Sequence, residues 1–356
     1  MNQTRLTRRT VLKLGAGASL AVPWLFVPRL VSASRRVDYD VVKTRRPFAR
    51  ALAASIVREE PSVKASPVRS IKWNEVVAVS GQTLSDESPS RHNKIWYQVN
   101  DGFVHSAFMQ PVEDTPQKPE SSVPQEGFWG ETYVASTAIR AAADPKAGMI
   151  FRMPFGTIFQ VLDVIEGGDQ EAWYRISDGR SEKLYVPGAA LRRIKPEEFA
   201  PLSPQIPLNH KRIDVDIRKQ MVFAYEDDTE VFRARCATGA YFRQADGTVQ
   251  DFTTTPGEHR IYQKTPSRRM SGGQEGEGDH YDLAGVPWVS YFTKSRIAFH
   301  GAYWHNDFGV QRSHGCVNLL PEDSQWVYRW TAPVAPHNER WTDTAKRDEG
   351  SLVRVI

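Results

Sequence analysis

The chain has 356 residues, of which 40% are hydrophobic and 25% are charged. This length suggests two to three domains, and the apolar content excludes a wholly disordered chain. The formal net charge is +4, but residues 1–33 carry five basic side chains and no acidic one, and without them 41 basic residues face 42 acidic ones. The rest of the chain has no global basic bias, which argues against nucleic acid as a partner.

The first 33 residues are typical of an export signal. Basic residues, among them Arg8 and Arg9, precede an apolar stretch over 14–27, and small side chains follow at 31–33. The paired arginines resemble those of a twin-arginine translocation signal, and an ordinary secretory signal or an uncleaved anchor are the alternatives. No later apolar run is long enough to cross a bilayer. We therefore expect an exported protein of the cell envelope, in the periplasm or the cell wall, which touches the membrane only through an uncleaved signal.

Residues 34–72 form a basic segment that we interpret as a spacer. The segment holds ten basic and four acidic side chains, and Pro61 and Pro67 interrupt it. The alanines and the leucine between Pro47 and Glu60 favour one short helix there.

Two stretches further along the chain repeat one pattern. In each, a strand that begins near Trp-Tyr leads into an Asp-Gly turn, a second strand, a small-residue turn and a last strand, at 96–108 and again at 173–191. This order resembles the bacterial SH3-like barrel. We therefore place one SH3-like module at 73–113 and a second at 131–196, joined by a proline-rich linker at 114–130.

From residue 205 onward the chain predicts a further, mainly β domain. Alternating residues predict strands at 213–217, 220–225, 230–238, 259–262 and 296–300. Pro321 and two acidic residues in the first turn predict one short helix over 321–330. On its strand Cys236 shares the parity of the apolar residues, which favours a buried small side chain. We expect a β-sandwich at 205–332 and a C-terminal tail at 333–356.

The polar stretch from His300 to Asn318 is the candidate for chemistry. Cys316 directly follows a glycine, and three histidines lie within sixteen positions of it. A thiol needs a base or a positive neighbour to act as a nucleophile near neutral pH, since its free pKa is about 8.5, and histidine suits that task. Gly315 lets the backbone turn sharply, so that its amide and that of Cys316 can point at an oxyanion.

Three other interpretations of these residues stay open. Cys316 could form a disulfide with Cys236 in an exported protein. His300, His305, His314 and Cys316 supply four possible zinc ligands, in a spacing that matches no common structural zinc pattern. The histidines could also be ordinary core or surface residues. The residue chemistry alone favours a thiol nucleophile only modestly.

The two ends of this stretch carry a strong resemblance. His300-Gly301 is followed, after about a dozen residues, by Ser313-His314-Gly315-Cys316-Val317-Asn318. Together they resemble the signature of the L,D-transpeptidase catalytic domain of the YkuD type. The flanking segments agree, and the resemblance covers about 210–332. One departure is that Gly257 follows Pro256 directly, where the family often has a residue between them, which concerns only a loop.

This resemblance implies a reaction on peptidoglycan stem peptides. Cys316 would be the nucleophile, His300 its proton acceptor and donor, and His314 would help to shape the oxyanion site. The product would be a thioester, which an amine of a neighbouring stem resolves into a 3→3 cross-link. No metal or organic cofactor is implied. The alternatives are resolution by water, which makes a carboxypeptidase, and a wall-binding scaffold that works through the SH3-like modules.

The resemblance also implies roles for the neighbours of these three residues. The Gly301 carbonyl would orient the histidine ring, and the Gly315 amide would face the oxyanion. Ser313 and Asn318 would hold the loop and the substrate. Tyr303, in the loop between His300 and Cys316, is a candidate for the wall of the substrate groove, and simple packing is the alternative for such an aromatic residue. The family's thioester chemistry predicts carbapenem-type inhibitors as partners, and we expect a monomer.

Overall fold

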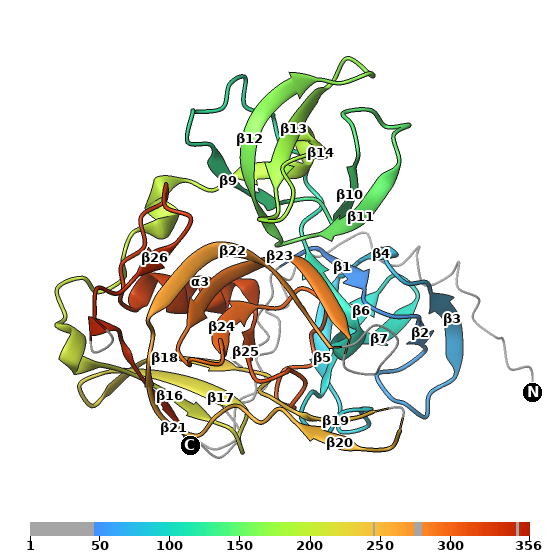
Figure 1. The fold of residues 1–356 in the computed structure, drawn as a ribbon. Coiled ribbons are helices and arrows are strands. Elements are labelled where there is room, and N and C mark those ends of the chain that lie inside the picture. Colours follow the sequence, from blue (N-terminus) through green and yellow to red (C-terminus); the bar gives the residue numbers. More distant parts are fainter. Residues whose placement is uncertain (1–45, 245, 274–279, 347–348) are drawn as a thin grey trace, which may run out of the picture. The chain divides into compact units, whose positions relative to one another are not determined.

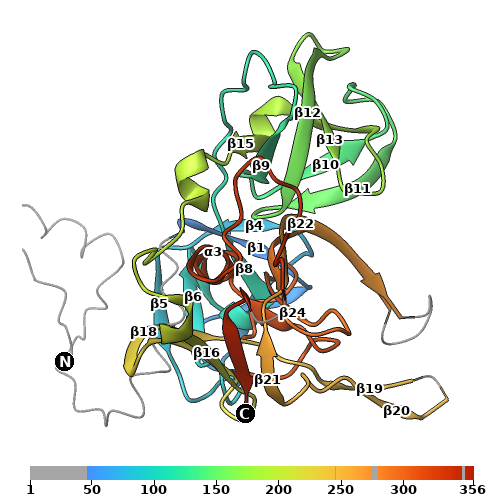
Figure 2. The same cartoon turned by 60° about the vertical axis from the view of Figure 1, so that its left-hand side comes forward.

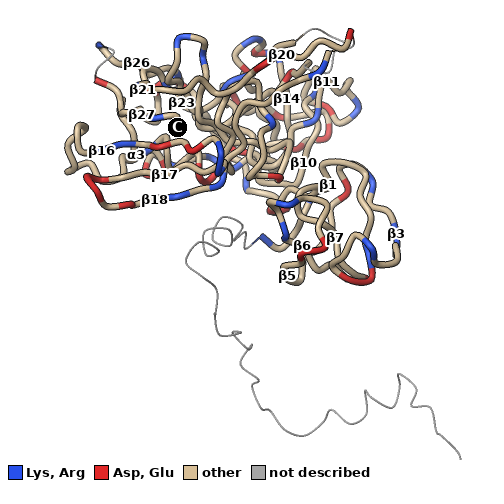
Figure 3. Tube along the Cα trace, turned by 90° about the horizontal axis from the view of Figure 1, so that it is seen from below, with Lys and Arg blue, Asp and Glu red and all other residues tan. Residues whose placement is uncertain are grey.

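The computed structural model describes residues 46–244, 246–273, 280–346 and 349–356 (Figure 1). The export signal expected at 1–33 and the first part of the basic spacer lie outside these residues. The described chain is mainly β, with the α-helix α3 (Pro321–Trp330) and a few short 3-10 turns. No helix within it is long and apolar enough to span a membrane. Basic and acidic residues are interspersed along it (Figure 3).

Eight strands form two sheets between Phe48 and Val112. One sheet has the order β4-β1-β8 and the other the order β3-β2-β7-β6-β5. The strands are β1 (Phe48–Ala51), β2 (Ser55–Arg58), β3 (Pro67–Ile71), β4 (Val76–Ala78), β5 (Gly81–Leu84), β6 (Ile95–Val99), β7 (Gly102–His105) and β8 (Met109–Val112). Buried side chains from both sheets, such as Val57, Tyr97 and Met109, share one core. We call residues 48–112 the first module.

Strands β1 to β3 correct two expectations about the residues before position 73. The helix expected between Pro47 and Glu60 is wrong, because this stretch contains β1 and β2. Ala49 and Ala51 favour a helix by propensity, yet both are fully buried on a strand that pairs with β4 and β8. Tertiary pairing overrides the propensity of alanine. The spacer therefore ends before β1, and the first module begins at Phe48.

A seven-stranded sheet follows, with the order β11-β10-β14-β13-β12-β9-β15. Its strands are β9 (Phe128–Thr132), β10 (Ser136–Arg140), β11 (Met149–Pro154), β12 (Ile158–Glu166), β13 (Ala172–Ser177), β14 (Leu184–Pro187) and β15 (Leu191–Arg193). Its buried core includes Phe159, Tyr174 and Val186. We call residues 128–193 the second module; its first strand begins inside the linker expected at 114–130.

The two modules contain the repeat that the sequence predicted. In the first module β6, β7, the 3-10 turn η1 (Ser106–Phe108) and β8 follow one another, and in the second β13, β14, η2 (Gly188–Ala190) and β15 do so. Neither module forms a closed barrel among its described strands. Kinship with SH3-like barrels therefore stays a prediction.

Two five-stranded sheets after residue 205 share one core with helix α3. Their orders are β18-β17-β16-β27-β21 and β25-β24-β23-β22-β26, and the hairpin β19-β20 extends beyond them (Figure 2). The strands are β16 (Lys211–Asp216), β17 (Met221–Glu226), β18 (Thr229–Arg235), β19 (Tyr241–Arg243), β20 (Val249–Asp251), β21 (Gly257–Arg260), β22 (Gln263–Gly272), β23 (Tyr281–Tyr291), β24 (Ala298–Gly301), β25 (Val317–Leu319), β26 (Thr342–Asp343) and β27 (Leu352–Val355). Val215 of the first sheet, Phe299 of the second and Val327 of the helix meet in this core. The helix has the bounds that the sequence predicted.

The terminal strand β27 corrects the expectation of a tail at 333–356. This strand pairs in parallel with β16 and antiparallel with β21, so it lies inside its sheet. Val353 and Val355 are buried in the shared core, while Leu352 and Arg354 alternate with them. The sequence did not predict this strand for two reasons. A run of four residues is too short for its hydrophobic periodicity to identify a strand, and its parallel partner β16 lies far away in sequence.

Shortening Val353 to alanine is expected to lower the free energy of unfolding by about 2–3 kcal/mol, because apolar groups leave a fully buried site. The matched control is Arg354→Ala on the same strand. Arg354 forms an exposed ion pair with Glu258, at 3.0 Å, and such pairs contribute about 0–1 kcal/mol. Urea unfolding of both variants measures the difference. Equal losses would mean that the terminal strand does not belong to the core.

Candidate active site

His300 and Cys316 lie on neighbouring strands of one sheet. His300 is on β24, and Cys316 directly precedes β25, which pairs in parallel with β24 so that Phe299 lies opposite Val317. In the same register, the residues that precede Phe299 and Val317, which are Ala298 and Cys316, lie side by side. Phe299 and Val317 point into the shared core, whereas Ala298 and Cys316 pack with another cluster on the opposite face. Because side chains alternate along a strand, His300 projects to the same face as Cys316.

Burial keeps the imidazole of His300 neutral. The residue is 3% exposed, and burial lowers its pKa from 6.5 to about 4. Its Nδ1 lies 3.2 Å from the Gly301 carbonyl oxygen, the contact expected of that carbonyl. Since a carbonyl oxygen only accepts, Nδ1 carries the proton of the neutral ring, and Nε2 keeps a lone pair that can accept one.

The thiol of Cys316 is half-buried and is also neutral. Burial raises its pKa from 9.0 to about 11, while a hydrogen bond from the Ala298 backbone acts in the opposite direction. The Sγ atom lies 4.0 Å from the Arg296 carbonyl oxygen, to which the thiol can donate. At pH 7 the resting site thus holds a thiol and a neutral imidazole. Such a pair activates the sulfur by moving its proton during the attack.

The turn before Cys316 is held by two hydroxyl groups. Gly315 has a φ of +111°, and a Cβ atom there would lie 3.2 Å from the Ile297 side chain. The Gly315 amide donates to Ser313 Oγ at 3.1 Å, and the Ser313 hydroxyl donates to the Cys316 carbonyl. Thr254 Oγ1 donates to the Gly315 carbonyl at 2.8 Å. The Gly315 amide is therefore engaged within the turn, which differs from the oxyanion contact expected of it, whereas Ser313 holds the loop as expected.

The ring of His314 is packed among three aromatic side chains. It stacks on Phe242 of β19 with ring centroids 4.2 Å apart, and it contacts Phe252 and Tyr281 at 4.7 Å each. The hairpin β19-β20, its exit and β23 thus fix the orientation of this imidazole. The part of His314 in the oxyanion site stays a prediction.

Asn318 lies beside another buried histidine. Its Nδ2 is 3.0 Å from His305 Nε2, and its backbone bonds that of Ala237 in both directions, at 3.0 Å each. Burial lowers the pKa of His305 to about 3. Asn318 is 2% exposed and lies on β25, and its contacts hold this strand against Ala237 and His305. Its contact with substrate stays a prediction.

Tyr303 is packed inside the protein, which differs from the groove wall expected of it. The residue is buried, and its hydroxyl donates to the Ala284 carbonyl of β23 at 2.8 Å. Its ring belongs to the cluster that also contains Ala298 and Cys316. Tyr303 therefore supports the surroundings of the thiol.

The disulfide and zinc interpretations find no support in the described chain. Both cysteines are free thiols, and Cys236 is fully buried in the shared core, as its parity predicted. Within the residues that the structure describes, no group of three or more His, Cys, Asp or Glu side chains is placed to hold a metal ion.

A cavity of about 1010 Å³ opens beside the loop that leads into β24. Thr255, Tyr262, Phe292 and Lys294 contribute to its walls, together with Thr293 and Ser295. His300 and Cys316 are not among its lining residues, but the loop continues into Arg296, whose carbonyl faces Sγ. The cavity is thus linked to the site along the chain through Arg296.

One family model matches the part of the chain that contains this candidate site. The family model of the L,D-transpeptidase catalytic domain (YkuD) matches residues 210–353, a range that includes β16 and the first half of β27. The chain is 26% identical over 135 residues to the putative L,D-transpeptidase YciB of Bacillus subtilis (strain 168), over 35% of this chain and 63% of that protein. It thus spans less than two thirds of this curated relative.

Solved structures with similarity to the chain carry the same family name. The L,D-transpeptidase from Mycobacterium smegmatis is 20% identical, with a TM-score of 0.31, and the match covers 41% of this chain and 58% of that one. The LD transpeptidase LdtMt1 in complex with imipenem is 15% identical, also with a TM-score of 0.31, over 50% of this chain and 75% of that one.

Proposed function

We propose that this chain is a peptidoglycan L,D-transpeptidase, from the premise that its residues 210–353 belong to the L,D-transpeptidase catalytic domain family. The observation that carries the proposal is the placement of His300 and Cys316 on one face of adjacent parallel strands. Both groups are neutral at pH 7, with the imidazole in the tautomer that can accept a proton from the thiol.

In the first half-reaction the thiol becomes acylated. As Cys316 Sγ attacks the carbonyl between the third stem residue and D-alanine, its proton moves to His300 Nε2. The Cys316 amide, near the aromatic packing of His314, would stabilise the oxyanion. The carbon–nitrogen bond then breaks, the imidazolium gives its proton to the departing D-alanine amine, and a thioester remains.

In the second half-reaction an amine of a neighbouring stem attacks the thioester. His300 takes a proton from this amine and returns one to the leaving thiolate, which yields a 3→3 cross-link and the free enzyme. No step requires a metal or an organic cofactor. The cavity whose lining ends one residue before Arg296 would accommodate an extended stem peptide, with Tyr262 as an apolar surface and Lys294 as a cation for its carboxylates, although Glu258 also lines it.

The remaining features of the chain fit such an enzyme. The signal at 1–33, of the twin-arginine type, would deliver a monomer to the cell envelope, where its substrate lies. The two modules would be SH3-like. Carbapenems would acylate Cys316, as suggested by the structure of LdtMt1 with imipenem.

The direct test is incubation of the purified protein with disaccharide tetrapeptides, followed by mass spectrometry of the products. A transpeptidase gives dimers that have lost one D-alanine. Tripeptides without dimers would mean that water is the acceptor and that the chain is a carboxypeptidase. Unchanged tetrapeptides, together with retention on isolated cell walls, would favour the wall-binding scaffold.

A further inference from the structure

The first module reaches the loop that follows His300. Arg50 on β1 is 3% exposed, and its Nη2 donates to the Tyr303 carbonyl oxygen at 3.2 Å. Gln110 Oε1 accepts from the Arg50 Nε and Nη2 atoms at 3.0 and 2.6 Å, and Asn74 Oδ1 accepts from Nη1 at 3.2 Å. Arg50 thus joins the sheet β4-β1-β8 of this module to the backbone three residues after His300.

Asn306 anchors the same loop at a second point. Its Nδ2 donates to the Ser106 carbonyl at 3.1 Å and to the Tyr97 hydroxyl at 3.3 Å, both in the first module. Asn93 Nδ2 donates to the Asn306 carbonyl at 3.5 Å. All four residues are buried, and buried polar groups favour the geometry that satisfies their hydrogen bonds.

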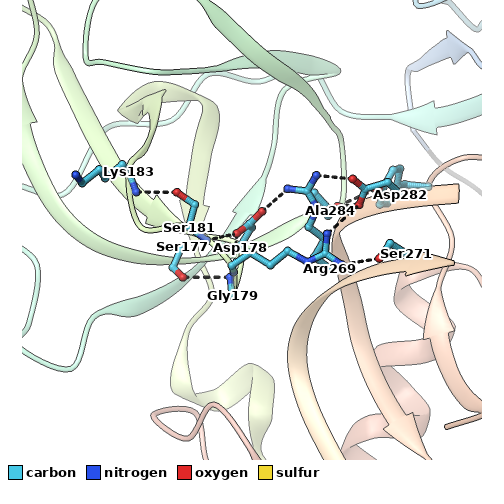
Figure 4. A network of polar contacts seen from close by, with 11 residues as sticks. Ser177, Asp178, Gly179, Ser181, Lys183, Arg269, Ser271, Asp282 and Ala284 are labelled. Carbon is cyan, nitrogen blue, oxygen red and sulfur yellow. Dashed lines mark hydrogen bonds and ion pairs between the residues drawn. The ribbon is translucent and has the colours of Figure 1, made fainter. Parts of the chain in front are cut away.

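A polar network ties the second module to the strand beside this loop (Figure 4). The fully buried side chain of Asp178 accepts from Arg269 Nη1 at 2.6 Å, and Arg269 donates to both carboxylate oxygens of Asp282, at 2.8 and 2.5 Å. Asp282 is on β23, two residues from Ala284, whose carbonyl accepts the Tyr303 hydroxyl. Tyr303 is therefore held by its carbonyl from the first module and by its hydroxyl from a strand tied to the second.

We propose that the two modules act as a brace that places His300 against Cys316, with Arg50 as the principal positioning residue. The inference rests on the proposed function. Tyr303, which Arg50 holds, packs in the same cluster as Cys316, and the loop begins directly after the His300-Gly301 pair.

The buried guanidinium of Arg50 contributes more to the position of the loop than to the stability of the fold. Its hydrogen-bond acceptors are all neutral oxygens, and burial lowers its pKa to about 10. The hydrogen bonds of a guanidinium in such a place largely offset its desolvation and add little net stability. Their main effect is therefore to fix the geometry of the loop.

The test follows acylation of the purified chain by imipenem through the mass of the adduct over time. Arg50→Ala is expected to lower the second-order rate constant by about 10–100-fold, since a displacement of about 1 Å at reacting groups can cost that much. Arg50→Lys, which keeps a cation and some donors, should lie between this variant and the wild type. Arg69→Ala is the matched control and should keep the wild-type rate, because Arg69 pairs with Glu75 and Asp101 inside the first module.

Combination with His300→Ala separates positioning from general loss of fold. If Arg50 acts through His300, Arg50→Ala will change the rate by less than about twofold in the His300→Ala background. A merely structural role would lower the rate by the same factor in both backgrounds and would overturn the proposal, as would an unchanged rate in Arg50→Ala alone.

Two further outcomes are distinguishable. If Arg50→Ala does not yield folded protein, Asn306→Ala removes the second anchor of the loop and is tested in the same cycle, with the same expected result. A wild-type chain that imipenem leaves unmodified would overturn the proposed function and this inference with it. Normal acylation of the wild type with equal rates in the variants would overturn the positioning role alone.

Discussion

Replacing Cys316 with alanine is expected to abolish cross-linking and acylation by carbapenems while the fold stays intact. Loss of a nucleophile lowers turnover on the order of 10⁴-fold or more, because no other group can form the covalent intermediate. The Cys316 residue is half-buried at the end of a polar turn, and its Sγ atom has as partners the Ala298 backbone and, at 4.0 Å, the Arg296 carbonyl. Its removal should therefore change the melting temperature little. Mass spectrometry of the products and thermal unfolding measure the two effects.

Cys236→Ala provides the matched control for this experiment. Cys236 is fully buried among apolar side chains, so its truncation should lower stability by about 1–2 kcal/mol and leave activity unchanged. Full activity in Cys316→Ala would exclude this residue as the nucleophile. Loss of function in both variants only under oxidising conditions would favour a disulfide.

The candidate site was predictable from sequence because its chemistry is local. His300 and Cys316 stand sixteen positions apart, and the turn between Ser313 and Cys316 requires its hydroxyl and glycine at fixed spacing. Helix α3 could equally be predicted from the sequence, since proline at its start and acidic residues in its first turn are short-range signals.

The supports of the site were not predictable, because their partners are distant in sequence. Arg50 and Tyr303 are 253 positions apart, and nothing in the sequence around Arg50 distinguishes it from an exposed arginine. Thr254, which holds the Gly315 carbonyl, stands in a run of threonines that reads as a loop. The error over β1 has the same origin, since Ala49 and Ala51 are buried by strands that lie some 25 and 60 residues later. Each of these roles follows from packing that periodicity does not encode.

The charge state of the pair decides how the site should respond to pH. The pKa of His300 is about 4 and that of Cys316 about 11, so between these values the wild type holds a proton acceptor and an intact thiol. The acceptor form of His300 is lost only as the pH falls through about 4. The rate of acylation by imipenem should therefore be nearly constant from pH 6 to 9. A preformed thiolate–imidazolium pair would instead require that the pKa of the thiol lies below the pKa of the imidazole. The pair would then exist only at pH values between the two.

Replacing His300 with alanine is expected to slow acylation at pH 7 by about 10²–10⁴-fold, the usual contribution of positioned proton transfer. Without this base the reaction depends on the thiolate, whose fraction rises tenfold per pH unit below the pKa of about 11. The rate in the variant should therefore climb about tenfold per unit from pH 7 to 10. His210→Ala is the matched control, because this exposed histidine pairs with Asp227 away from the site.

The slope of the variant is more informative than its rate at one pH. A flat profile at a reduced rate would mean that another group still removes the proton, and His314, two residues from the thiol, would be the first to test by the double substitution. An unchanged rate at pH 7 would show that His300 is not the base. The expected outcome is a rate of acylation that rises tenfold per pH unit in His300→Ala and stays constant in the wild type. This outcome would require that His300 and Cys316 exchange one proton within the acylation step, which is what a neutral resting pair demands.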